Sequence, residues 1–252
     1  MIELRHICVD YGSQRAVDDV SLTLPTGMVT VLVGPNGCGK TTLLKAAARL
    51  LKPASGEVRY DGRPLDDFGR REFARMAAVL PQGRETPNIS VEMLVAHGRF
   101  PYLGLSRKPT RRDREIVRNA MEQAGVYAMR EKPVTALSGG ERQKAYIAMA
   151  IAQDTPVLLL DEPTTYLDIG RQFEILETVR SLHARGKTIV MVLHDLNQAL
   201  CYADQLAVME KGRLRMRGTP EQVLHSGLLQ QVFGVRIADA PGAGYCFAPQ
   251  KF

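Results

Sequence analysis

The sequence predicts an α/β fold with a parallel sheet at its centre. Continuous apolar runs at 29–33, 157–160 and 188–193 are typical of strands buried on both faces of a parallel sheet. Helix-forming segments lie between these runs, and a glycine-rich loop follows the first one. With 252 residues, the chain can form one large domain or two small ones.

The first third of the chain is rich in β-strand patterns. Apolar and polar residues alternate over Ile2–Val9 and Val20–Leu24, and Gly56–Gly62 resembles a strand that ends in an Asp-Gly turn. A helical pattern follows at Arg70–Met76, and Ala77–Leu80 is predicted to be a short buried strand. We therefore expect a β-rich N-terminal part that leads into the parallel sheet.

The segment 84–156 has a different character. Helix is favoured near Val91–His97, Arg112–Ala124 and Gly140–Ala152, and strand patterns are nearly absent. Glycine, proline and charged residues separate these helices. This segment is predicted to be a helical insertion in the β/α core.

The remaining elements are a long helix, a hairpin and a tail. From Ile169, apolar residues recur at helical spacing until Gly186 ends the helix, and they describe one helix face: Ile169, Phe173, Leu176, Val179 and Leu182. The segments 205–210 and 213–217 predict a hairpin that turns at Lys211-Gly212, and Thr219–Gln222 has the pattern of a helix N-terminus. The tail from Arg236 is predicted to be irregular.

Composition and charge are those of a soluble globular protein. The net charge is +6, but Lys and Arg are spread along the chain, and the local cluster 107–114 has no interleaved aromatic residues. We therefore predict a solvated loop and first helical turn there, with no nucleic-acid role. No apolar run is long enough to span a bilayer, and the N-terminus does not resemble a secretion signal. Four scattered cysteines suggest neither a metal cluster nor a disulfide framework, and we expect a cytosolic chain.

The glycine-rich loop Gly34–Thr41 is a complete G-x-x-x-x-G-K-[ST] phosphate-binding motif. It follows a predicted strand and precedes a predicted helix, which is the context that this motif requires. Glycines allow several backbone N–H groups to converge on one anion, and the helix directs its positive end to the same place. Lys40 adds a positive charge near the β- and γ-phosphates, and Thr41 offers a hydroxyl to Mg²⁺.

Two further motifs narrow the function. In Leu137–Gln143, Ser138 and Glu141 have the spacing of a helix-capping box, but capping does not explain the paired glycines between them. The apolar run at 157–160 ends in Asp161, which suits Mg²⁺, and Glu162, which suits a general base. His194 follows the apolar run at 188–193 and is placed to contact the γ-phosphate.

These motifs, in this order and together with Gln82, resemble the ATP-binding subunit of ABC transporters, from Ile2 to about Phe233. The resemblance implies a P-loop NTPase (RecA-like) core with an N-terminal antiparallel β-subdomain and an inserted α-helical subdomain. It implies a single nucleotide-binding domain with the following parts: core and β-subdomain at 1–83 and 157–233, helical subdomain with the signature motif at 84–156, and a C-terminal tail at 234–252.

The resemblance also implies a role for each matching residue. The implied catalytic residues are Lys40, Gln82, Glu162 and His194. The implied nucleotide-binding residues are Tyr11, Gly34, Pro35, Asn36, Gly37, Cys38, Gly39, Lys40, Thr41, Thr42, Ser138, Gly139, Gly140 and Asp168. The implied Mg²⁺ ligands are Thr41, Gln82 and Asp161. Tyr11 matches an aromatic residue that stacks on adenine, and Asp168 matches an aspartate at the dimer contact.

The mechanism expected from this resemblance needs two chains. Each of two ATP molecules lies between the phosphate loop of one copy and Ser138 of the other, and hydrolysis opens the dimer. The chain is then a peripheral protein on the cytoplasmic face of the inner (plasma) membrane. Its partners are polytopic permease subunits and, indirectly, a substrate-binding protein.

The segment 89–104 is similar to the permease-contacting segment of importers of iron–siderophores, haem and vitamin B12. Iron(III)-siderophore import is therefore the first expectation, with haem or cobalamin import as alternatives. A soluble ABC ATPase outside transport is a less favoured alternative, because such proteins typically carry long coiled-coil insertions, zinc hooks or tandem cassettes. A P-loop kinase would lack the segment 137–143.

The position of Cys38 at a helix N-terminus predicts a favoured thiolate. Alkylation of this thiol should inhibit the ATPase, and bound MgATP should protect it.

Overall fold

The computed structural model describes residues 1–83, 86–104, 108–240 and 244–249. The chain forms two compact units. The first unit combines both ends of the chain, Met1–Asp67 with Val190–Phe252, and the second is the middle segment Phe68–Ile189.

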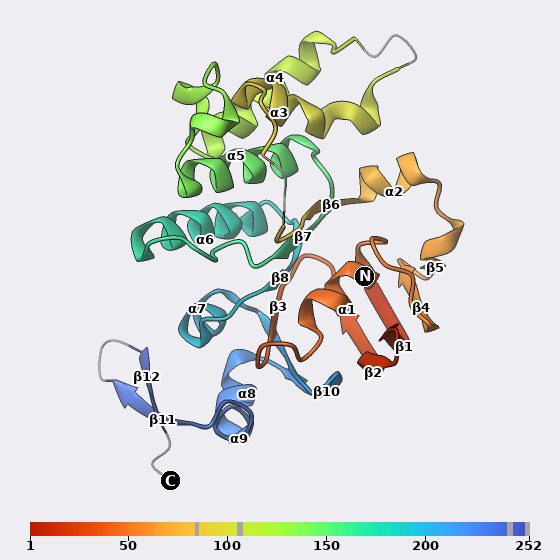
Figure 1. Cartoon of the computed structure of the whole chain (residues 1–252), viewed down its shortest axis with the longest axis vertical. Coiled ribbons are helices and arrows are strands. Elements are labelled where there is room, and N and C mark those ends of the chain that lie inside the picture. The colour runs from red at the N-terminus through yellow and green to blue at the C-terminus, as the bar shows by residue number, and fades with distance from the viewer. Residues whose placement is uncertain (84–85, 105–107, 241–243, 250–252) are drawn as a thin grey trace. The chain divides into compact units, whose positions relative to one another are not determined.

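The N-terminal part of the first unit is an antiparallel sheet, as the alternating sequence predicts (Figure 1). Its strands, in spatial order, are β2 (Gln14–Leu24), β1 (Ile2–Tyr11), β4 (Ser55–Tyr60) and β5 (Arg63–Pro64). Ile2 on β1 lies opposite Leu24 on β2 and Tyr60 on β4, and all three side chains are buried. The 3-10 turn η1 (Leu65–Asp67) completes this segment.

The same unit contains a parallel strand pair that carries the glycine-rich loop. β3 (Val29–Val33), buried over its full length, pairs in parallel with β9 (Gln205–Glu210). β9 turns at Lys211-Gly212 into the antiparallel β10 (Arg213–Gly218), which confirms the predicted hairpin. The loop after β3 leads directly into α1 (Lys40–Ala47).

The C-terminal segment of the first unit differs from its prediction at one point. Its helices are α7 (Leu196–Tyr202), α8 (Pro220–His225) and α9 (Leu228–Phe233), and Thr219 caps α8 as expected. The tail is not irregular, because β11 (Val235–Ala240) pairs with β12 (Gly244–Pro249). The residues Pro241, Gly242 and Ala243 lie outside the described residues. β-forming residues on both sides of the Gly/Pro run, such as Ile237 opposite Phe247, favour a hairpin over a coil.

The strands of the second unit follow the predicted β/α order. α2 (Arg70–Met76) leads into β6 (Ala77–Leu80), which pairs in parallel with β7 (Val157–Asp161). All five residues of β7 are buried, as expected for a continuous apolar run. α6 (Ile169–Ala184) follows, and β8 (Thr188–Val192) crosses from the second unit into the first.

Between β6 and β7 the second unit is helical, as the segment 84–156 predicts (Figure 1). Its elements are α3 (Val91–Ala96), the 3-10 helix η2 (His97–Tyr102), α4 (Arg111–Gln123), the 3-10 turns η3 (Tyr127–Met129) and η4 (Val134–Ala136), and α5 (Gly139–Ala152). α3, α4 and α5 pack on one another around buried residues such as Val95, Val117, Met121 and Ala145.

The apolar face predicted for α6 is buried only from Ile175 onward. Leu176, Val179 and Leu182 are buried, but Ile169 and Phe173 are 72% and 48% exposed. Periodicity identifies the apolar stripe of a helix but not how much of its length is covered. The buried stripe begins only at Ile175, so the first two turns of α6 present apolar side chains to solvent.

Within the described ranges, no helix is both long and apolar enough to cross a membrane. α6 has 16 residues and α5 has 14. A bilayer-spanning helix needs about 20 apolar residues.

Candidate functional site

The phosphate-binding loop lies in the first unit, and its backbone requires glycine at two positions. Gly34 and Gly39 have φ angles of 156° and 100°, which lie outside the range that L side chains favour. A Cβ atom on Gly39 would lie 2.5 Å from the carbonyl oxygen of Ala16, and one on Gly34 would lie 2.2 Å from that of Met209. The loop therefore holds its shape through close backbone contacts that no other residue permits.

The positive groups of the loop converge on the start of α1. Gly39 is the N-cap residue of α1 and has no side chain to cap the N–H groups of the first turn. The Lys40 side chain is buried, and its Nζ donates hydrogen bonds to the carbonyl oxygens of Gly34 (2.7 Å) and Pro35 (3.0 Å). Backbone N–H groups, the helix dipole and one ammonium group thus form the electropositive cradle that a phosphate chain requires.

Cys38 does not behave as its position in the loop predicts. Its side chain is buried, and its Sγ lies 3.8 Å from Lys40 Nζ. Burial raises the pKa of the Cys38 thiol above its ordinary value, although the Lys40 ammonium acts in the opposite direction. The expectation of a favoured thiolate is therefore wrong, because desolvation outweighs the helix N-terminus and the lysine.

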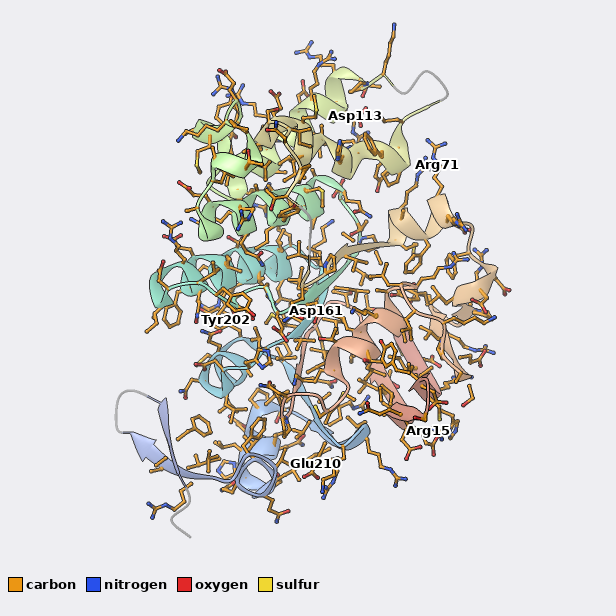
Figure 2. The ribbon with its side chains drawn as sticks, viewed as in Figure 1. Arg15, Arg71, Asp113, Asp161, Tyr202 and Glu210 are labelled. Carbon is orange, nitrogen blue, oxygen red and sulfur yellow. The ribbon has the colours of Figure 1, made fainter. Side chains whose placement is uncertain are left out.

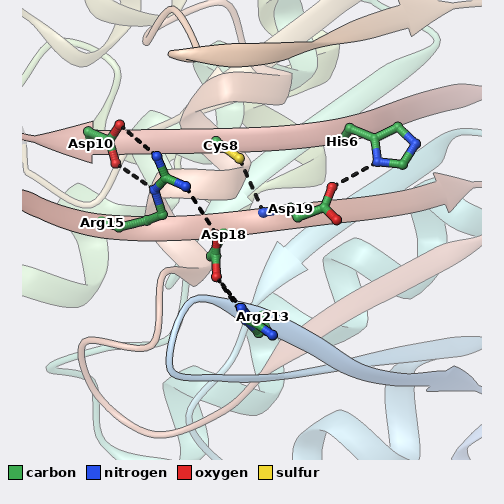
Figure 3. Close-up of polar contacts among 7 residues, drawn as sticks. All are labelled: His6, Cys8, Asp10, Arg15, Asp18, Asp19 and Arg213. Carbon is green, nitrogen blue, oxygen red and sulfur yellow. Dashed lines mark hydrogen bonds and ion pairs between the residues drawn. The ribbon is translucent and has the colours of Figure 1, made fainter.

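Tyr11 ends β1, an inner strand of the antiparallel sheet, and its side chain is half exposed. Beside it, Arg15 Nε donates to Asp10 Oδ1 (3.0 Å), and Arg15 Nη1 donates to Asp18 Oδ1 (3.3 Å). Asp18 Oδ2 accepts from Arg213 Nε on β10 (2.8 Å), as Figure 3 shows. The Arg213 hydrogen bond holds the pKa of Asp18 below its usual range. Ion pairs this accessible to water stabilise a fold little, but the chain of pairs links β1, β2 and β10 at the end where Tyr11 lies.

Backbone hydrogen bonds connect this end of the sheet to the phosphate loop. The N–H of Gly212, in the turn between β9 and β10, donates to the carbonyl of Cys38 (3.1 Å), and the N–H of Asp18 donates to the carbonyl of Gly212 (2.8 Å). The first unit therefore brings Tyr11 and the loop residues Gly34–Thr42 into one connected region. His194 belongs to the same unit, where it follows β8 and is exposed.

The signature segment of the second unit is a capped helix end with exposed glycine. Ser138 N donates to Glu141 Oε2 (2.8 Å), and Glu141 N donates to Ser138 Oγ (3.3 Å), which confirms the predicted capping box. The hydrogen bonds that Glu141 makes with the backbone N–H and the hydroxyl of Ser138 hold its pKa below its usual range. A Cβ atom on Gly139 would meet no atom within 4 Å, so the fold of this chain does not require glycine there.

The two carboxylates at the end of β7 differ in environment. Asp161, labelled in Figure 2, is buried at the end of the strand. Glu162 is half buried and has a φ of 51°, the left-handed conformation that costs a non-glycine residue roughly 1–2 kcal/mol. Its Oε2 accepts hydrogen bonds from Gln82 Nε2 (2.5 Å) and Thr165 Oγ1 (3.1 Å). The strained backbone and these two hydrogen bonds together fix the direction of the Glu162 carboxylate. Strained residues of this kind often lie at functional sites.

Glu162 and Gln82 face a cavity of about 200 Å³ within the second unit. The cavity is lined by Gln82, Thr86, Gly139, Arg142, Gln143, Tyr146, Glu162, Thr165, Tyr166 and Leu167. Gln143 Nε2 also donates to the carbonyl of Pro163 (2.7 Å), which ties α5 to the loop that carries Glu162. No role was predicted for Thr165, Arg142 and Tyr146. Arg142 lies inside the segment 137–143, and Thr165 and Tyr146 lie three residues after Glu162 and Gln143.

The predicted site residues thus fall into two groups. Tyr11, the phosphate loop and His194 lie in the first unit, whereas Gln82, Ser138, Gly139, Gly140, Asp161, Glu162 and Asp168 lie in the second. Within the second unit, Gln82, Gly139 and Glu162 line one cavity. Asp168 is the N-cap residue of α6, where its Oδ1 accepts from Arg171 N (2.9 Å).

A glycine-built phosphate loop between a buried strand and a helix, followed along the chain by a strand that ends in two carboxylates, defines a P-loop nucleotide-binding protein. The ABC transporter family model matches residues 17–165, and the chain belongs to that family. It is an ABC-type ATPase subunit and binds ATP, as the sequence predicts.

Two relatives named for siderophore import or transport align with almost the whole chain. The petrobactin import ATP-binding protein FpuD of Bacillus anthracis is 42% identical over 92% of this chain and 86% of its own length. The achromobactin transport ATP-binding protein CbrD of Dickeya dadantii is 44% identical over 95% of this chain and 90% of its own length. A solved structure, the dimeric post-hydrolysis state of the ATP-binding cassette MJ0796 bound to ADP and Pi, is 25% identical with a TM-score of 0.77, over 87% of this chain and 99% of its own.

Proposed function

We propose that this chain hydrolyses ATP to power the import of iron(III)-siderophore complexes through separate permease subunits. The observation that carries the proposal is the near-complete match, above 40% identity, to two ATP-binding proteins named for siderophore transport. The alternatives, haem or cobalamin import, receive no support from these relatives. A soluble ABC ATPase outside transport is also less favoured, because the insertion at 84–156 is short.

The residues of the phosphate loop bind ATP in this proposal. The backbone N–H groups of 34–42 and the start of α1 surround the phosphates, and the Lys40 ammonium leaves its carbonyl partners in the loop to neutralise the γ-phosphate. Tyr11, exposed at the end of β1, offers its ring to the adenine base. Mg²⁺, when bound, offsets the negative charge that develops between the β- and γ-phosphates.

The proposed Mg²⁺ ligands fit that ion by their chemistry. Thr41, Gln82 and Asp161 offer a hydroxyl, an amide and a carboxylate oxygen, which are the hard ligands that Mg²⁺ prefers. Asp161 is fully buried at its strand end, where a bound cation compensates a desolvated carboxylate. Thr41 belongs to the first unit, and Gln82 and Asp161 belong to the second.

Glu162 acts as the general base. Its carboxylate removes a proton from water as the water oxygen bonds to the γ-phosphorus and the bond to the β-phosphate oxygen breaks. The hydrogen bonds from Gln82 and Thr165 and the strained backbone direct the carboxylate before substrate arrives. His194 contacts the γ-phosphate and responds to its loss.

Two copies of the chain complete each site. Ser138, Gly139 and Asp168 are exposed and available to a second copy. The ATP-binding cassette MJ0796, a similar solved structure, is dimeric with ADP and Pi bound. ATP joins the two copies, and hydrolysis separates them. The permease contacts the segment 89–104, which places the chain as a peripheral protein at the cytoplasmic face of the inner membrane.

The decisive experiment measures uptake. Cells that lack this chain should lose uptake of ⁵⁵Fe-labelled ferric siderophore but keep uptake of labelled haem and cobalamin, and the wild-type gene should restore it. Glu162→Gln should not restore uptake and should accumulate as an ATP-bound dimer on size exclusion. Loss of haem or cobalamin uptake instead would reassign the substrate. Normal uptake of all three would place the chain outside these importers.

A further inference from the structure

The short helix η2 presents two opposite faces within the second unit. On one face, Phe100 is 57% exposed and its ring lies 4.6 Å from that of His97. Met93, on the preceding helix α3, is 54% exposed. We call these two side chains, Met93 and Phe100, the docking pair. They are large apolar groups left uncovered in the segment that the proposed function assigns to the permease contact.

The other face of η2 is anchored by Arg99, whose side chain is almost fully buried. Its Nε donates to Asp113 Oδ1 in α4 (3.0 Å), and its Nη1 donates to the carbonyl of Ala152 at the end of α5 (2.9 Å). The guanidinium also stacks on the ring of Tyr102, 4.0 Å from its centroid. One side chain therefore joins η2 to two helices.

Asp113 is itself held in place by the first turn of α4. Its Oδ2 accepts hydrogen bonds from the N–H of Thr110 (2.9 Å) and from its hydroxyl (2.6 Å). Burial alone would raise the pKa of Asp113, but the Thr110 hydrogen bonds and Arg99 outweigh it and hold the pKa below its usual range. The carboxylate stays ionised near neutral pH and keeps its charge opposite Arg99. Figure 2 labels Asp113 at this position.

Tight backbone packing prevents η2 from moving separately from α5. A Cβ atom on Gly98 would lie 2.3 Å from the carbonyl oxygen of Met149, so the two backbones are in direct contact. The carbonyl of Pro101 accepts from Arg71 Nε (2.8 Å) and Arg75 Nε (2.9 Å) of α2. Displacement of η2 must therefore displace the C-terminal end of α5.

α5 carries that displacement to the signature segment at its other end. The helix spans 14 residues, about 21 Å, from Gly139 to Ala152, and Ser138 caps its first turn. We propose that Arg99 is a positioning residue, which links the docking pair rigidly to α5 and so couples permease contact to the placement of Ser138 and Gly139. This inference rests on the proposed function, because it assumes that the permease binds at 89–104.

The chemistry of the anchor favours this role over simple stabilisation. A buried ion pair often contributes no more stability than apolar groups of the same volume, because both charges lose their hydration. Arg99 instead makes three directional contacts at once, to a carboxylate, a carbonyl and an aromatic ring. A lysine keeps the charge but not the planar fork that reaches all three.

The test uses the whole transporter, copurified with its permease and reconstituted in lipid vesicles. Arg99→Lys should reduce the ratio of permease-stimulated to basal ATPase rate by about tenfold, while the KM for ATP changes less than twofold. The matched control is Arg118→Lys, which alters the exposed pair of Arg118 with Glu122 on α4 and should leave the ratio unchanged. Asp113→Asn should reproduce the Arg99→Lys result, because it removes the other half of the anchor.

A double-mutant cycle gives the sharper readout. If the docking pair acts through Arg99, Phe100→Ala should lower the stimulation ratio of the wild type but have little further effect in Arg99→Lys. Additive effects would overturn the proposal, and so would a normal stimulation ratio in folded Arg99→Lys and Asp113→Asn. Equal losses of basal and stimulated rates with a lower Tm would show a purely structural role. A wild-type complex without permease stimulation would instead refute the proposed function.

Discussion

The phosphate loop and the signature segment are both glycine-bearing helix starts, yet the fold treats them differently. In the loop, Gly39 lies in the left-handed region and a Cβ atom there would collide with the Ala16 carbonyl. In the signature, Gly139 is exposed and has open space around it. The first glycine is required by contacts inside the chain, whereas nothing inside the described part of the chain explains the second.

This difference shows where each half of the proposed site is completed. The loop is preorganised by its own backbone, because Gly212 and Lys40 hold it with hydrogen bonds before any ligand arrives. The signature has a satisfied cap, and Gly139 lies on an uncovered surface that a ligand can approach from outside. Gly140 is buried instead, and a Cβ atom there would lie 2.5 Å from Arg171 Cδ. Substitutions in the loop should therefore lower stability, whereas substitution of Gly139 in the signature should lower activity without lowering stability.

The largest effect is expected from Gly39→Ala. The φ of 100° and the 2.5 Å approach to a backbone oxygen should lower the free energy of unfolding by at least about 2 kcal/mol and weaken ATP binding more than a hundredfold. Gly37→Ala is the matched control, since its φ is 75° but its Cβ would meet no atom within 4 Å. Chemical denaturation and nucleotide titration measure both. Equal stability of the two variants would contradict the preorganised loop.

Gly139→Ala should lower the ATPase rate without lowering stability. Alanine favours helix over glycine by up to about 1 kcal/mol, so the Tm should stay the same or rise. The added methyl group occupies the surface offered to the second copy, so the ATPase rate should fall about tenfold or more while monomeric ATP binding is kept. Steady-state ATPase assays against protein concentration test this. A normal rate would show that the signature surface does not meet a nucleotide.

Glu141→Gln should give a smaller, pH-dependent effect on stability. The pKa of Glu141 is lowered in the folded state, so its contribution is complete above its ordinary pKa and disappears as the pH falls through the lowered value. The variant should melt slightly below the wild type at pH 7, and the two should converge in acid, once Glu141 is protonated in the folded wild type. Thermal unfolding followed by circular dichroism across this range measures the gap. A gap that persists in acid would mean that the cap does not depend on the charge.

The smallest effect concerns the thiol in the loop. Because Cys38 is buried and its pKa is raised, iodoacetamide should modify it about tenfold more slowly than the exposed Cys201 in the native protein. Peptide mass spectrometry after a timed reaction measures the alkylation of Cys38 and Cys201 separately. In urea-unfolded protein, the two cysteines should react at similar rates. Faster labelling of Cys38 would show that the loop opens in solution.

Local patterns predicted most of the elements correctly. The G-x-x-x-x-G-K-[ST] loop, the capping box at Ser138 and the hairpin at Lys211-Gly212 each depend on residues close together in sequence. The features that were predicted wrongly or not predicted at all depend on distant residues. The exposed first turns of α6, the hairpin formed by the tail and the raised pKa of Cys38 all depend on what does or does not cover a segment.

The sequence by itself determined the class of protein, because phosphate binding needs particular residues at fixed spacing and leaves a local signature. Only the tertiary structure revealed the Arg99–Asp113 anchor and the hydrogen bonds that Gln82 and Thr165 make to Glu162. In the sequence, Asp113 belongs to a basic cluster expected to be solvated, yet it is buried and paired with an arginine 14 residues earlier. Burial and charge pairing are set by packing between elements, and no local pattern records which elements will meet.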